Sequence, residues 1–181
     1  MLDGLIIRRA TGEDLDTLVR FSAAMALETE GRQLDESRLR QGTRAVLESP
    51  ARGFYTVAEL TDRSPRLVVG QLLVTFEWSD WRNATFWWIQ SVYVDSAWRR
   101  RGVYRRMHEG ILQQARQEGD VCGVRLYVEG ENAVAKTVYT KVGLNASSYH
   151  VFEEDFILLA KPPGRAGTAS DGTGRRRRES R

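Results

Sequence analysis

The sequence predicts a mixed α/β protein in which helices pack on a central β-sheet. Segments with a strand-like pattern and segments with a helix-like pattern alternate along the chain, in the order β-α-α-β-β-β-α-β-α-β-β. The chain has 181 residues, of which 41% are hydrophobic and 28% are charged. This length and composition are typical of one soluble globular domain with a substantial core.

The first part of the chain predicts one strand and two helices. The stretch LIIRRAT, at 5–11, predicts a short strand. Thr11, with Asp14 three residues later, is a typical helix N-cap pattern, so a first helix is expected over 13–28. A second helix is expected over 35–49, where a proline follows.

The middle of the chain predicts three strands. Runs rich in β-branched and aromatic residues lie at 54–61, 67–78 and 85–94, with turn-forming residues between them. Alternation in the third run sends Trp87 and Trp88 to opposite faces of the sheet, so at most one of them faces a ligand. Core packing is expected for at least two of the four tryptophans Trp78, Trp81, Trp87 and Trp88.

The second half predicts two helices and two further strands. A helix is expected over 102–119, because an apolar residue recurs at every fourth position: Val103, Met107, Ile111 and Ala115. A strand is expected over 124–130, and a last strand over 149–160. Between them a helix is expected over 132–144, with an apolar stripe formed by Val134, Val138 and Val142.

Whole-chain features disfavour several functional classes. The lone Cys122 cannot form an internal disulfide, and His108 and His150 lie too far apart to suggest a metal-ligand cluster. No apolar run approaches the roughly 20 residues that cross a bilayer, and the first residues lack the build of a secretory signal. We therefore expect a cytoplasmic protein that uses no metal and contacts no membrane.

The basic charge of the chain is concentrated in its last residues. Residues 161–181 carry seven basic and two acidic side chains, whereas residues 1–160 carry 20 basic and 22 acidic ones. We expect a folded domain over 1–160 and a disordered tail over 161–181, which is rich in Pro, Gly, Ser and Arg. Nucleic-acid binding by the folded part is disfavoured. The RRRR run at 175–178 could contact an anionic surface or only solubilise the terminus.

The segment SVYVDSAWRRRGVYRRM, at 91–107, has the features of an anion site. It runs from a strand through a turn into a helix, whose first N–H groups have no partner within the helix. Gly102 can adopt a positive φ or admit a close approach of the anion. The forked donors of the surrounding arginines suit phosphate oxygens: Arg99, Arg100, Arg101, Arg105 and Arg106. The segment therefore suits a pyrophosphate.

This segment resembles the acetyl-CoA signature of the GNAT acyltransferases, in which Arg/Gln-x-x-Gly-x-Gly/Ala follows a strand that ends in Val. Val92, Val94, Arg99 and Gly102 match the signature. Tyr104 departs from it, because the family usually has a small residue there. The ring of this tyrosine must turn away from the cofactor, whereas its backbone N–H can still serve a phosphate.

The stretch NAVAKTVYTKVGL resembles the second block of the same family, Asn-x-x-Ala-x-x-x-Tyr-x-x-x-Gly-Phe. Asn132, Ala135, Tyr139 and Gly143 match, and Leu144 replaces the Phe. The two blocks stand in the family's order, and the resemblance covers residues 5 to about 160. It implies the GNAT acyl-CoA N-acyltransferase fold, a central mixed, mostly antiparallel sheet flanked by helices.

The resemblance implies an N-acetyltransferase that passes the acetyl group of acetyl-CoA directly to an amine. The helix-start N–H groups would bind the pyrophosphate, and a strand N–H would bind the thioester carbonyl. Tyr139 would protonate the leaving thiolate as general acid, or would only pack on the sheet. Asn132 would contact the pantetheine arm, or would only cap its helix. The implied cofactor-binding residues are Val92, Tyr93, Val94, Arg99, Arg100, Arg101, Gly102, Val103, Tyr104, Arg105, Asn132, Ala135 and Tyr139.

An ammonium acceptor must lose a proton before it attacks, and carboxylates near the acetyl site are the candidate bases. Glu77 and Asp80 could act directly or through water, or could only be solvated hairpin charges. Glu28 and Glu30 could bind a cationic acceptor, or only solvate the end of a helix. The sequence does not separate a small-molecule amine from a peptide amine.

Two other functions stay open. The chain could be a CoA-binding or regulatory module on the same fold without turnover, because fold does not fix function. It could also bind RNA through its arginines, in which case the affinity would fall steeply with ionic strength and depend on residues 161–181. The resemblance further implies a homodimer, since members of the family are often dimers.

Overall fold

The computed structural model describes residues 4–128, 130 and 132–157. The chain divides into two compact units, Met1–Asn145 and Ala146–Arg181, and the helices and strands below belong to the first. The tail predicted over 161–181 lies outside the described residues, and the domain boundary after residue 160 stays a prediction.

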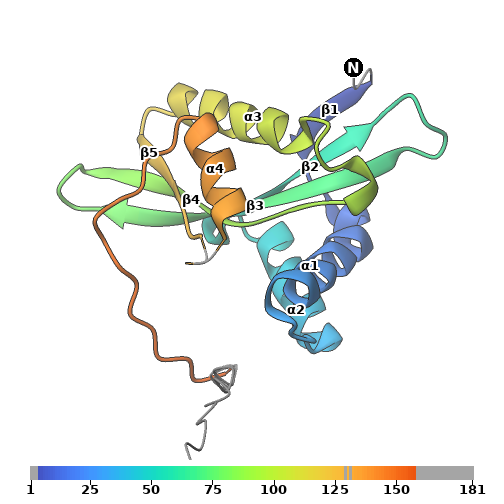
Figure 1. The fold of residues 1–181 in the computed structure, drawn as a ribbon, viewed down its shortest axis with the longest axis horizontal. Coiled ribbons are helices and arrows are strands. Elements are labelled where there is room, and N and C mark those ends of the chain that lie inside the picture. Colours follow the sequence, from blue (N-terminus) through green and yellow to red (C-terminus); the bar gives the residue numbers. More distant parts are fainter. Residues whose placement is uncertain (1–3, 129, 131, 158–181) are drawn as a thin grey trace, which may run out of the picture. The chain divides into compact units, whose positions relative to one another are not determined.

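The first unit is built on a five-stranded sheet with the strand order β1-β2-β3-β4-β5 (Figure 1). The strands are β1 (Leu5–Arg9), β2 (Phe54–Leu60), β3 (Leu67–Ser79), β4 (Ala84–Val94) and β5 (Val121–Leu126). Strands β1 to β4 pair antiparallel, and β5 pairs parallel with β4. The mixed, mostly antiparallel sheet that the sequence predicts is therefore confirmed.

Helices lie on both faces of this sheet. The helices are α1 (Leu15–Glu30), α2 (Glu36–Glu48), α3 (Val103–Gln117) and α4 (Ala133–Lys141). Figure 1 shows α1 and α2 on one side of the sheet and α3 on the other. Short 3₁₀ turns lie at Gly12–Asp14, Pro50–Arg52 and Ser96–Trp98.

The predicted apolar stripe of α3 packs on the sheet. Val103, Met107 and Ile111 are fully buried in the main hydrophobic cluster, where each side chain contributes about 1.5–3 kcal/mol. Val92 and Val94 of β4 pack against the same cluster. Alternation along β4 therefore turns the side chain between them, that of Tyr93, toward α1 on the opposite face.

Three predicted elements differ from the structure. The strand predicted over 124–130 begins three residues earlier and ends at Leu126, because its partner β4 leaves it there. The stripe predicted for α4 is incomplete, since Val134 is 78% exposed. The strand predicted over 149–160 is wrong within the described residues 149–157, which form no strand. There the Ile157 N–H bonds to the Asp155 carboxylate, a turn bond that competes with strand pairing.

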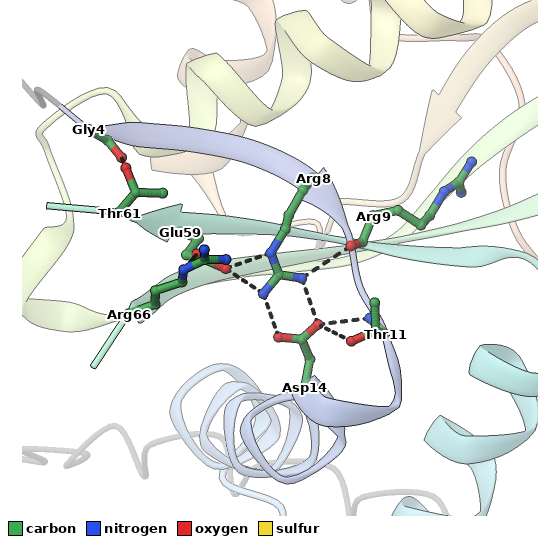
Figure 2. A network of polar contacts seen from close by, with 8 residues as sticks. All are labelled: Gly4, Arg8, Arg9, Thr11, Asp14, Glu59, Thr61 and Arg66. Atoms are coloured by element: carbon green, nitrogen blue, oxygen red, sulfur yellow. Dashed lines mark hydrogen bonds and ion pairs between the residues drawn. The ribbon is translucent and has the colours of Figure 1, made fainter. Parts of the chain in front are cut away.

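A buried ion-pair network fixes α1 on the sheet, as Figure 2 shows. Arg8 of β1 donates two hydrogen bonds to Asp14, of 2.8 and 2.9 Å, and also binds Glu59 of β2. Asp14 in addition accepts a hydrogen bond of 2.8 Å from the N–H of Thr11, the residue predicted to cap the helix. Because Asp14 directly precedes α1, the network sets where that helix starts.

Candidate active site

β4 separates from β5 at Gln90, in the middle of the sheet. The register of β4 against β3 shifts by one residue at this point, which makes Gln90 the extra residue of a β-bulge. The parallel pairing with β5 ends at Ile89, just before the bulge. Residues 90–94 therefore have β3 on one side and no described strand on the other, so their outward backbone groups are not used in pairing with another described strand.

α3 begins next to this open edge, and its first N–H groups have no partner within the helix. Gly102 is the N-cap, with a φ of 87° in the left-handed region that side chains disfavour. The first backbone bond of the helix runs from the Arg106 N–H to the Gly102 oxygen, at 3.1 Å. The N–H groups of Val103, Tyr104 and Arg105 therefore point out of the helix end and, with the helix dipole, can bind an anion.

Three arginines surround this N-terminus with exposed side chains. The guanidinium of Arg101 lies 5.0 Å from the centre of the Trp98 ring, and Arg105 lies 3.9 Å from Glu109 one turn along α3. The backbone of Arg100 has a φ of 62°, in the left-handed region. Contacts this exposed and this long are weak, so these side chains can turn toward a phosphate.

α4 carries the second block of motif residues. Asn132 caps the helix, since its side-chain oxygen accepts a hydrogen bond of 2.9 Å from the Ala135 N–H. Gly143 follows the helix with a φ of 91°. Tyr139 is half-buried, and burial raises the pKa of its hydroxyl above the ordinary value. The phenol is therefore neutral at working pH and can act as an acid.

Tyr104 lies next to Tyr139, and His108 packs on the Tyr104 ring from one turn further along α3. The sequence motifs did not point to His108. The ring centre of Tyr104 is 5.8 Å from that of Tyr139 and 5.8 Å from that of His108. The Tyr104 hydroxyl and both ring nitrogens of His108 are buried and have no hydrogen-bond partner among the described residues. The spacing of four residues on one helix is the sequence signal that places these two side chains together.

Glu28, at the end of α1, reaches the other face of β4. Its carboxylate accepts a hydrogen bond of 2.8 Å from the Tyr93 hydroxyl and pairs with Arg99. Arg99 also donates a hydrogen bond of 2.8 Å to the oxygen of Val94. Of the two acidic residues considered for a cationic acceptor, Glu28 is thus held beside the open edge, whereas Glu30 lies 3.7 Å from Arg32.

The two carboxylates predicted as general base lie away from this edge. Glu77 is opposite Phe86 in the register, whereas Val92 is opposite Leu72, which places Glu77 roughly 16 Å further along β3. Glu77 pairs with Arg125, and the Asp80 carboxylate accepts a hydrogen bond from the Trp81 N–H in the hairpin turn. The structure therefore does not bring either residue to residues 92–94.

The tryptophans divide as alternation predicts. Trp87 is buried in the main cluster, and Trp88, on the opposite face, lies with its ring centre 4.4 Å from that of Tyr127. Trp78 and Trp81 are exposed, and of the four only Trp87 lies in the core cluster, so the prediction of core packing for at least two of them is wrong.

A separate cavity of about 560 Å³ lies where β4 begins. Arg9, Phe54, Trp87 and Glu118 are among its lining residues, and none of the motif residues reaches it. Within the described residues, no group of acidic, His or Cys side chains is arranged to hold a metal ion. No described helix combines the length and the apolar character needed to span a membrane.

Comparisons with known proteins relate this arrangement to one family. The sequence model of the acetyltransferase (GNAT) family matches residues 21–144. The solved structure of a possible acetyltransferase from Clostridium difficile 630 is 39% identical, with a TM-score of 0.78 over 86% of this chain and 100% of that one. No curated protein matches the chain.

More distant solved structures share the fold. The aminoglycoside N-acetyltransferase AAC(6')-Iy, in complex with CoA, is 11% identical, with a TM-score of 0.67 over 84% of this chain and 95% of that one. A transcriptional regulator from Bacillus halodurans C-125 is 20% identical, with a TM-score of 0.70 over 84% and 99%. The family match over residues 21–144 and the 39% identical structure give the assignment. The chain belongs to the acetyltransferase (GNAT) family.

Proposed function

We propose that this protein is an N-acetyltransferase that moves the acetyl group of acetyl-CoA directly to an amine of a small molecule or peptide. One observation carries the proposal: the unpaired first N–H groups of α3 follow, one turn later, the stretch of β4 that has no described strand on its outer side. The first feature suits the pyrophosphate, and the second suits the extended pantetheine arm with its thioester.

The reaction needs three groups around the thioester. A backbone N–H from Val92, Tyr93 or Val94 would bind the carbonyl oxygen as negative charge develops on it. Tyr139 would give its proton to the leaving thiolate, which its neutral phenol allows. Asn132 and Ala135 would hold the pantetheine arm where α4 begins, and the cap bond between them keeps that end of the helix in place.

The acceptor would enter from the α1 side of β4. The Glu28 carboxylate lies there and would attract an ammonium group. The aminoglycoside acetyltransferases among the structural neighbours support a small-molecule acceptor. We keep Glu77 and Asp80 as candidate bases, but their distance along the strand excludes direct contact and one bridging water, so they would need a chain of several waters.

We also propose a cytoplasmic, homodimeric protein whose domain ends near residue 160, with a basic tail after it. Size measurement in solution and limited proteolysis test these proposals. Proteolysis that removes residues 161–181 first supports the boundary, whereas early cleavage near residue 145 places the boundary at the edge of the first compact unit.

The first experiment compares the native protein with Tyr139→Phe. Thiol release from acetyl-CoA is followed over a panel of amines, and CoA binding is measured by calorimetry. We expect the variant to bind CoA with nearly unchanged affinity and to transfer acetyl about 100-fold more slowly. Native protein that binds CoA but releases no thiol with any acceptor indicates a binding or regulatory module instead. Absence of CoA binding contradicts the whole proposal.

A further inference from the structure

A buried polar cluster on α3 has no role in the proposed function so far. It consists of Tyr104 and His108, which are four residues, about one helical turn, apart on α3. Three of its atoms, the Tyr104 hydroxyl and the two His108 ring nitrogens, are buried without a hydrogen-bond partner in the described part of the chain. Each such orphaned group lowers the stability of a fold, so three of them in one place call for a function.

The position of the cluster suggests that function. The Tyr104 ring meets the Tyr139 ring edge to face, with ring centres 5.8 Å apart, and His108 packs on the same Tyr104 ring. His108 is fully buried, and burial lowers its pKa, so its imidazole is neutral and adds no charge. The residue that departs from the family signature thus lies with its ring against that of the proposed general acid, and its buried hydroxyl is bonded to no described group.

The general-acid role proposed for Tyr139 leaves a phenolate there, and the Tyr104 hydroxyl can donate a hydrogen bond to it. The acceptor nitrogen bonds to the acetyl carbon. When the thioester C–S bond then breaks, the Tyr139 O–H bond breaks as well, and its proton forms the S–H bond of CoA. A phenolate is then left in a half-buried place, where a charge without a donor is costly. Solvent returns a proton to the phenolate after CoA leaves, and the amide product releases the acceptor's proton to solvent.

We infer that Tyr104 is a positioning residue for Tyr139, whose buried hydroxyl donates a hydrogen bond to the phenolate that forms during acetyl transfer. His108 packs on the Tyr104 ring and so fixes where it lies. This inference rests on the proposed function of Tyr139. It gives a reason for the large side chain at a signature position where the family usually has a small one.

The decisive experiment is a double-mutant cycle of Tyr104→Phe and Tyr139→Phe in the full-length protein. Turnover with saturating amine, CoA affinity by calorimetry and Tm are measured for the four proteins. Tyr104→Phe should lower kcat about tenfold or more and leave the CoA affinity within about twofold, because a bond to a charge made only during the reaction is lost. In the Tyr139→Phe background, the same change should have no further effect on kcat.

The stability readout separates this role from a structural one. Tyr104→Phe removes an orphaned hydroxyl and keeps the ring, so the Tm should stay the same or rise while kcat falls. Tyr55→Phe is the matched control: the Tyr55 hydroxyl is also buried but bonds to Thr43 and Ser22. Its loss should lower the Tm and leave kcat unchanged.

Three results would overturn the inference. The first is an unchanged kcat in Tyr104→Phe while Tyr139→Phe is slow, which rejects the inference and leaves the proposed function standing. The second is equal slowing by Tyr104→Phe in both backgrounds, because the effect then does not pass through Tyr139. The third is a normal rate in Tyr139→Phe, which rejects the general acid itself. If no amine in the panel releases thiol, the proposed function fails, and this inference fails with it.

Discussion

Arg99 and Glu28 form an ion pair that joins the turn before α3, which we propose binds phosphate, to the C-terminal end of α1. The same carboxylate binds the hydroxyl of Tyr93, and Arg99 also binds the backbone oxygen of Val94. Hydrogen bonds through Glu28 and Arg99 therefore link the proposed cofactor-binding edge of β4 to the α1 side, where we propose that the acceptor binds. Changes at Glu28 should act on the acceptor first, because Arg99 keeps its bond to β4 without it.

Glu28→Gln should raise the KM for a cationic amine about fivefold and change the Kd for CoA less than twofold. The substitution removes the charge that attracts an ammonium and keeps the shape of the side chain. Steady-state kinetics and calorimetry measure the two constants. Glu48→Gln, an exposed change on α2, serves as control. An equal loss in amine and CoA binding would show that Glu28 acts only by holding the turn.

The pH dependence of amine binding should follow the ionisation of the Glu28 carboxyl group. The hydrogen bond from Arg99, and then that from Tyr93, lower the pKa of this carboxyl below its ordinary value. The carboxylate therefore stays ionised, and its contribution is constant down to about pH 4.5, then lost as the pH falls through the lowered pKa. A titration of KM against pH tests this, and loss of the charge effect above pH 5 would contradict it.

Gly102→Ala should weaken CoA binding on the order of tenfold. Its φ of 87° costs an L residue about 1–2 kcal/mol, so the turn that presents the α3 N–H groups shifts. Gly119→Ala, after the end of the same helix, is the matched control, because an added Cβ meets nothing there and φ is ordinary. Calorimetry with CoA measures both. Equal CoA affinities in the two variants would show that the turn is not part of the cofactor site.

Ionic strength should weaken the binding of CoA but not that of acetyl-pantetheine, which lacks the diphosphate. The exposed guanidinium groups of Arg101 and Arg105 act through partly screened charge. Arg105→Ala should therefore reduce the salt dependence for CoA and lower its affinity about two- to fivefold at low salt. The same salt dependence for both ligands would place the diphosphate elsewhere.

Features that depend on local sequence, such as the apolar stripe of a helix, could be predicted. Features that depend on which strands pair, such as a bulge or the end of a strand, could not. The stripe of α3 follows a helical period, so Val103, Met107 and Ile111 were predicted as buried and are so. The bulge at Gln90 depends on which strands become neighbours, and no local residue type predicts it. The same event ends β5 at Leu126, which is why the predicted strand 124–130 lies too late in the chain.

In the candidate site, too, the residues within local motifs could be predicted, and the contacts made by tertiary packing could not. The motif residues around Gly102 and Tyr139 are local patterns and could be predicted as a site. The bond between Glu28 and Tyr93 joins residues 65 positions apart, and only the packing of α1 on β4 creates it. The base candidates Glu77 and Asp80 were chosen by closeness in sequence to a strand, and the register carries them toward the far end of the hairpin.

The last prediction concerns stability, through the Arg8 network. Arg8→Ala leaves Asp14 and Glu59 buried, at 5% and 1% exposure, without their main cation. Breaking a fully buried pair costs about 3–5 kcal/mol of unfolding free energy, and because the Arg8 side chain is 30% exposed we expect a loss at or below the lower end of that range. Arg66, 3.6 Å from Glu59, offsets part of this loss. Arg40→Ala is the control, since it breaks only the exposed pair with Asp16 and should cost about 1 kcal/mol or less.

The same network makes stability depend on acid. Burial tends to raise the pKa of Asp14, but the bonds from Arg8 outweigh it and hold the pKa below its ordinary value. The stabilisation is therefore complete above about pH 4, the unfolded value, and is lost as the pH falls through the lowered folded value. Urea unfolding between pH 7 and pH 2 should show this loss in the native protein and a flatter profile in Arg8→Ala. Parallel profiles in the two proteins would show that Asp14 gains nothing from Arg8, and that other contacts position the start of α1.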